Sequence, residues 1–143
     1  MAGKLLRLLL LTWLLLPSGG AWADPVVIVN SRSGIAVMSR SDVINVFFGR
    51  NRQFFNGIEA QAIDLLDQHP LREIFYQRLV GKDLAEVNAY WSRQVFSGRM
   101  QAPLRAASID EVLKWVVEHP GGIGFIPLAR ADARVRVVFE LQP

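Results

Sequence analysis

The sequence contains no cysteine among its 143 residues. This absence excludes thiol catalysis, metal sites built on cysteine, and disulfide cross-links. A domain without disulfides has to be stabilised by its packed interior.

Residues that commonly carry catalysis are also scarce. The two histidines, His69 and His119, each precede a proline, and we expect both to be turn residues. A two-histidine metal site would need further ligands, and the spacing places none. No serine has a positioned base, the carboxylates are scattered, and no glycine-rich phosphate loop with its lysine is present. We therefore expect no enzyme, no cofactor and no metal site.

Long apolar runs are absent except at the N-terminus. Two basic residues precede an apolar run over residues 8–16, and Ala21-Trp22-Ala23 has the small-x-small form that signal peptidase accepts. The alternative is a membrane anchor, but the run is shorter than the roughly 20 residues of a membrane span. We predict a signal peptide at 1–23, a single domain at 24–143 and a periplasmic location.

Excess charge is small once the predicted leader is removed. The leader holds two of the 16 basic residues and none of the 13 acidic residues. The remaining 14 basic and 13 acidic residues give a net charge of +1. This balance lacks the basic surplus typical of proteins that bind nucleic acid, so we expect no such partner.

Strand and helix patterns alternate along residues 24–143. Strands are predicted at 26–29, 59–66, 123–126 and 134–139, and helices at 41–48, 70–81, 83–96 and 108–118, with a loop at 101–107. Ser41, Asp83 and Ser108 are the expected N-caps. Such alternation predicts an α/β sandwich with mostly parallel strands and right-handed crossovers.

The loop and helix at 67–81 are the first place to look for a ligand. Pro70 suits a first helical turn, and Gly81 suits a left-handed end. Free amides at this helix start, together with Arg72, could hold an anion. Arg72 could instead pair with Asp67 or Glu73 and fix the loop, as surface ion pairs commonly do.

A second candidate anion loop follows the first predicted strand. Ser31, Arg32, Ser33 and Gly34 offer hydroxyls, backbone amides and a guanidinium to an oxyanion. In open α/β sheets, ligands bind at the carboxyl ends of the strands, where we expect this loop to join Arg72. The alternative is an ordinary solvated turn between a strand and a helix.

Five motifs occur in a characteristic order along the mature chain. They are VVIVN at 26–30, VFFGR at 46–50, LREIFY at 71–76, YWSRQVFSGR at 90–99 and PGGIGFI at 120–126. In this order they resemble the short, single-lobe relatives of the periplasmic phosphate-binding proteins that serve ABC transporters. The resemblance implies one lobe of a type II periplasmic-binding-protein fold, with a mostly parallel sheet flanked by helices. It also implies phosphate or a similar oxyanion as ligand and a membrane transporter as partner.

The chain departs from the phosphate binders in two respects. Those proteins have two lobes, whereas this chain has the length of about one. They also carry a Ser-Gly-Thr run at a helix start, where hydroxyls and amides hold phosphate. The equivalent loop here, residues 67–72, reads DQHPLR and contains neither a hydroxyl nor a glycine.

Two functions remain open from the sequence. The first is an exported solute-binding protein that takes up phosphate or a similar oxyanion for an ABC transporter. The second is a non-catalytic interaction or accessory module that contacts a membrane transporter or another envelope protein. The open wall of a lone lobe could also receive a second copy, so a homodimer is a further expectation. Trp115 lies off the apolar stripe of its helix, and exposed aromatics can mark a contact surface.

Overall fold

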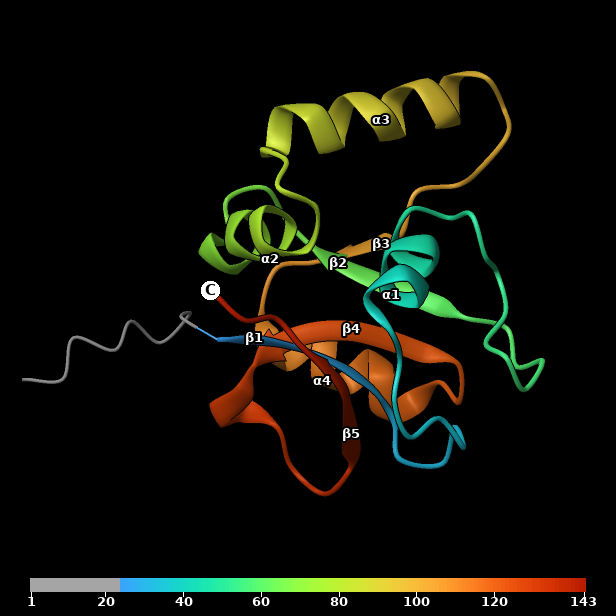
Figure 1. Ribbon diagram of the computed structural model, residues 1–143, viewed down its shortest axis with the longest axis vertical. Helices are drawn as coiled ribbons and strands as arrows, with labels where there is room; N and C mark the ends of the chain where they lie inside the picture. The colour runs from blue at the N-terminus through green and yellow to red at the C-terminus, as the bar shows by residue number, and fades with distance from the viewer. Residues whose placement is uncertain (1–23) are drawn as a thin grey trace, which may run out of the picture.

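The computed structural model describes residues 24–143, and the predicted signal peptide at 1–23 lies outside the described residues. The elements follow the order β1 (Pro25–Asn30), α1 (Arg40–Phe47), β2 (Gln61–Leu65), α2 (Pro70–Val80), α3 (Leu84–Phe96), β3 (Leu104–Ala106), α4 (Ile109–Glu118), β4 (Gly122–Pro127), the 3-10 helix η1 (Leu128–Arg130) and β5 (Val135–Glu140) (Figure 1). None of the helices in this part of the chain has the length and apolarity needed to cross a membrane.

A five-stranded sheet with the order β3-β2-β4-β1-β5 lies at the centre of the molecule (Figure 1). Strand β2 pairs in parallel with β3 and β4, whereas β1 pairs antiparallel with β4 and β5. Four strands therefore point the same way and β1 runs against them. This arrangement confirms an α/β lobe with a mostly parallel sheet. The expectation that the first strand runs parallel to its neighbours is wrong for β1. The sequence could not show this, because a buried apolar run has the same pattern in either direction.

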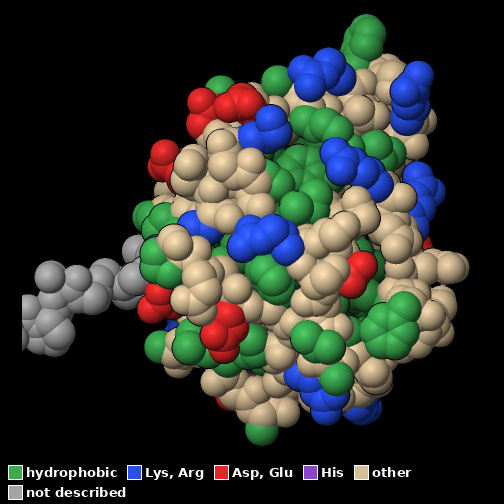
Figure 2. All heavy atoms as spheres, in the orientation of Figure 1, with side chains coloured by type: hydrophobic (Ala, Val, Ile, Leu, Met, Phe, Trp, Pro, Cys, Tyr) green, Lys and Arg blue, Asp and Glu red, His purple; other side chains and the backbone are tan. Residues whose placement is uncertain are grey.

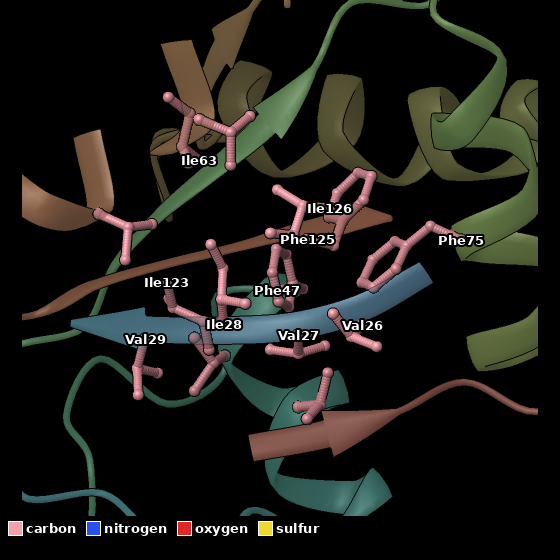
Figure 3. Packing of buried hydrophobic residues seen from close by; sticks show 14 of the residues in the cluster. Val26, Val27, Ile28, Val29, Phe47, Ile63, Phe75, Ile123, Phe125 and Ile126 are labelled. Carbon is pink, nitrogen blue, oxygen red and sulfur yellow. The ribbon is translucent and has the colours of Figure 1, made fainter. Parts of the chain in front are cut away.

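Helices cover both faces of the sheet, and β4 shows how each face is packed. Gly124 faces α4, where an added Cβ would lie 2.7 Å from Val112 Cγ1. The next residue, Phe125, points to the opposite face because side chains alternate along a strand. There its ring stacks on Phe75 of α2, with centroids 3.8 Å apart, and meets Phe47 of α1 edge-on at 5.9 Å (Figure 3). These aromatic contacts hold α1 and α2 against the sheet.

Helix α3 lies further from the sheet than α1 and α2 (Figure 1). Of its 13 residues only Val87 and Trp91 are buried. Tyr90 attaches the middle of α3 to the C-terminal end of α1. Its ring packs edge-on against Phe48, and its hydroxyl donates to Phe48 O at 2.6 Å. Val95, near the C-terminal end of the helix, is 50% exposed. The C-terminal end of α3 is therefore only loosely covered.

Two predicted boundaries are wrong. The N-cap of α1 is Ser39 and not Ser41, because Ser39 and Asp42 form a reciprocal capping box. The segment predicted as a loop at 101–107 contains β3, a three-residue strand whose pattern is too short to detect. The other helices begin or end within two residues of the prediction, and Gly81 ends α2 with a left-handed φ of 66°.

Candidate functional site

Arg72 lies in the first turn of α2, at the end of the sheet where β2 stops. Its side chain is fully buried. Nε donates to Asp64 Oδ1 at 3.2 Å, and Nη2 donates to Asp64 Oδ2 at 3.1 Å, so the guanidinium holds this carboxylate with two parallel bonds. Nη1 donates to Asp67 Oδ1 at 2.8 Å. Both sides of the guanidinium fork are therefore occupied by the protein's own carboxylates.

Asp64 is the buried centre of this cluster. Besides Arg72, it accepts hydrogen bonds from the Tyr76 hydroxyl at 2.7 Å and from the Leu65 amide at 2.7 Å. Burial raises the pKa of Asp64, and the charge of Arg72 together with these hydrogen bonds opposes that rise. Burial and the neighbouring Asp64 raise the pKa of Tyr76 well above its ordinary value, so Tyr76 remains a donor. The cluster is closed and internally satisfied.

The outer part of the cluster joins three elements. Asp67, which is half-exposed, accepts from Arg105 of β3 at 3.1 Å and from Asn88 of α3 at 3.2 Å. Arg105 also donates to Asn88 Oδ1 at 3.3 Å. The polar network therefore fixes α2 to α3 and β3, which is a structural role.

The start of α2 offers few amides to a ligand. Pro70 has no N–H, the Leu71 amide donates to His69 Nδ1 at 3.2 Å, and the Arg72 amide donates to His69 O at 3.1 Å. His69 is therefore the N-cap, confirming that it is a turn residue. Burial lowers its pKa, which favours the neutral ring that Nδ1 needs in order to accept.

The His69 cap predicts a stability that depends on pH. Because its pKa is lower in the folded state, the unfolded chain binds the proton first as the pH falls through the ordinary value of 6.5. The capping contribution is then present above pH 6.5 and is lost below it. Urea midpoints at about pH 7.5 and about pH 5.5 should show a larger acid loss for the wild type than for His69→Asn, since asparagine caps without titrating. Equal losses in the two proteins would refute this role.

The loop Ser31–Gly34 lies at the opposite end of the sheet from Arg72. Strand β1 pairs Val29 with Ile123, close to the start of β4, and β2 also starts there, with Gln61 opposite Gly122. Arg72, by contrast, follows the end of β2. The expectation that the loop and Arg72 share one ligand edge is therefore wrong, because β1 runs antiparallel to its neighbour.

Two side chains in and before this loop form hydrogen bonds with the protein's own backbone. The Asn30 amide donates to Val116 O and Val117 O, each at 3.0 Å, and so satisfies carbonyls at the C-terminal end of α4. Ser33 is buried and its hydroxyl accepts from the Ile35 amide at 3.1 Å. Ser31 and Arg32 are exposed, and Gly34 has a left-handed φ of 77°. This geometry fits the alternative of an ordinary turn.

Trp115 and His119, at the same C-terminal end of α4, also have local partners. The rings of Trp115 and His119 stack with centroids 3.6 Å apart, and His119 Nδ1 lies 2.8 Å from Trp115 O. Trp115 Nε1 donates to Gln61 O at 3.1 Å, and the side chain is only partly buried, as expected. Within residues 24–143, no cluster of three or more His, Asp or Glu side chains could hold a metal ion.

Sequence reasoning missed Asp64 and Tyr76 as members of the cluster. A signal for Asp64 was present, because it is the one charged residue in β2 (Gln61–Leu65). A carboxylate buried in a strand needs a cation or several donors, so Asp64 pointed to a partner such as Arg72.

No protein-family model and no curated protein matches this chain. Several solved structures match its fold, two of which follow. A protein from Clostridium perfringens, assigned as a phosphate ABC transporter substrate-binding protein and crystallised with bound phosphate, aligns with a TM-score of 0.64 at 11% identity over 80% of this chain and 44% of that one. An ABC-type phosphate transport receptor from Vibrio cholerae aligns with a TM-score of 0.64 at 12% identity over 80% of this chain and 45% of that one.

This chain spans less than half the length of either structure. The aligned part includes most of the α/β lobe, which agrees with the motif order found in the sequence. The described residues therefore have the fold of an α/β lobe like that of these phosphate-binding proteins.

Proposed function

We propose that this chain is an exported, non-catalytic interaction module that keeps the lobe of the phosphate binders but contacts a protein of the cell envelope instead of phosphate. The observation that carries the proposal is the buried Arg72, whose guanidinium is held by Asp64 and Asp67. The sequence resemblance places this helix start where phosphate binders have their Ser-Gly-Thr run. Here that position is filled by carboxylates and a histidine cap.

The energetics favour this proposal over oxyanion binding at Arg72. An anion could reach the guanidinium only by displacing Asp64 or Asp67. Leaving a buried carboxylate without its partner costs about 3–5 kcal/mol, whereas a dissociation constant of about 1 μM corresponds to about −8 kcal/mol in total. Displacement would therefore remove a large share of any binding energy, and the unpaired carboxylate would repel the anion.

The loop at the other end of the sheet supports phosphate binding no better. Ser33 is buried and its hydroxyl already serves the Ile35 amide, which leaves Ser31 and Arg32 on an exposed turn. The alternative function is oxyanion uptake with an ABC transporter. It is supported by the two structural neighbours, one with bound phosphate and one described as a phosphate transport receptor. A periplasmic location is consistent with the predicted signal peptide at 1–23 and with the absence of cysteine.

Calorimetry on residues 24–143 tests the proposal directly. Inorganic phosphate and sulfate, each titrated to millimolar concentration, should give no saturable heat, because no free guanidinium and amide set converges at the start of α2. A two-lobe phosphate-binding protein titrated in the same buffer is the positive control. Saturable heat with either anion would contradict the proposal, and the variants Arg32→Met and Arg72→Met would then identify the loop responsible.

A further inference from the structure

A groove of about 860 Å³ lies between the C-terminal half of α3 and the starts of β2 and β3. Trp91 and Val95 contribute to it from α3, Leu104 from β3 and Trp115 from α4. The groove is separate from the Asp64–Arg72 cluster, which lies at the end of β2. It uses the part of α3 that the rest of the fold leaves loosely covered.

Apolar side chains gather at this groove without a partner in the described lobe. Val95 is 50% exposed and Leu104 is 54% exposed, and both line the groove. A buried aliphatic side chain contributes about 1.5–3 kcal/mol, so Val95 and Leu104 both have much to gain from being covered. Grouped exposure of this kind is typical of a contact surface.

Two unpaired arginines lie beside the same apolar residues. Arg52 and Arg99 line the groove, together with one carboxylate, Glu59. Within residues 24–143 neither arginine forms an ion pair, whereas Arg72 and Arg105 do. Figure 2 shows Lys and Arg side chains around exposed hydrophobic side chains in the upper part of the molecule, where α3 lies in Figure 1. With two arginines against one glutamate, the groove therefore has a rim of net positive charge around an apolar centre.

The floor of the groove also exposes part of a sheet edge. Strand β3 pairs with β2 only over residues 63–65, so Gln61 and Ala62 have no strand neighbour on that side in the described sheet. On the other side, both residues pair with β4. An extended chain can lie along such an edge, with alternate side chains reaching the surrounding pockets.

We propose that this groove binds an extended acidic segment of a partner protein. An apolar side chain of the segment packs between Val95 and Leu104, and its carboxylates pair with Arg52 and Arg99. The planar guanidinium favours two-point pairing with a carboxylate, and the positive rim speeds the encounter with an acidic partner. This inference rests on the proposed interaction function and names its surface and the chemistry of its partner.

Site-specific photo-cross-linking in the cells that naturally make the full chain tests the proposal. Benzoylphenylalanine is placed at Val95 or Leu104 in the groove, and at Lys114 or Ala129 as exposed control positions outside it. We expect a discrete protein adduct at both groove positions, with a yield at least about tenfold above the controls. Mass spectrometry of the adduct should show a contact segment with a net negative charge. The double variant Arg52→Glu/Arg99→Glu should lower the adduct at Val95 about tenfold, whereas Lys114→Glu should leave it unchanged.

The outcomes separate this inference from the function on which it rests. Adducts that form at the control positions but not in the groove would overturn the groove assignment and leave the interaction function standing. A neutral or basic contact segment, a lipid adduct alone, or an adduct unaffected by charge reversal would also overturn it. Absence of a protein adduct at all four positions would contradict the interaction function itself. Far-ultraviolet circular dichroism of each variant shows that a lost adduct does not reflect unfolding.

Discussion

Replacing Arg72 with alanine should lower the free energy of unfolding by about 3–5 kcal/mol. The substitution leaves the Asp64 carboxylate buried without the guanidinium that now holds it with two bonds. Urea denaturation followed by circular dichroism measures the loss. The matched control is Arg105→Ala, which removes a more exposed partner of Asp67 and should cost no more than about 1 kcal/mol.

A second variant separates the effect of the buried charges on stability from the effect of the buried side-chain volume. The double substitution Asp64→Leu/Arg72→Met removes both charges and keeps most of the buried volume, so it should recover most of the stability lost in Arg72→Ala. If Arg72→Ala cost less than about 1 kcal/mol, Arg72 would not be the buried counter-charge described here, and the site would be open to an external anion.

Replacing Gly121 with alanine should destabilise the fold by more than about 3 kcal/mol. A Cβ at this position would lie 1.8 Å from Glu59 O, a backbone atom, so no rotamer change could relieve the clash. The two segments are also joined by the bond from the Gln61 amide to Gly121 O at 2.8 Å. Thermal or urea unfolding of Gly121→Ala measures the effect.

Gly81→Ala is the matched control for Gly121→Ala. Gly81 has a left-handed φ of 66°, but an added Cβ there would meet no atom within 4 Å. Its cost should be limited to the backbone penalty of about 1–2 kcal/mol. Equal losses for the two alanine variants would show that the close approach between Gly121 and Glu59 does not constrain the fold.

Local signals in the sequence were enough to predict the helices. Pro70 at the first turn and Gly81 at the end define α2, and Asp83 caps α3 as expected. The continuous apolar run at 26–29 also predicted β1, which is buried along its whole length. These features could be predicted because each depends on residues close together in the chain.

Features that depend on distant residues could not be predicted in the same way. The direction of β1 is determined by its pairing with β4 and β5, whose residues lie about a hundred positions away. The burial of Arg72 depends on Asp64 from β2, and a helical pattern alone places an arginine on the solvent side. The structure therefore differs more from the predicted site than from the predicted fold. Arg72 is a buried structural residue, and the loop Ser31–Gly34 lies at the other end of the sheet.

The carboxylates of Asp64 and Asp67 occupy the Arg72 guanidinium, where an oxyanion would otherwise bind. A crystal structure of residues 24–143 grown in phosphate tests this claim most directly. We expect Arg72 to remain bonded to Asp64 and Asp67, with no phosphate at the start of α2. Phosphate within hydrogen-bonding distance of the Arg72 guanidinium, with either carboxylate displaced, would contradict the account.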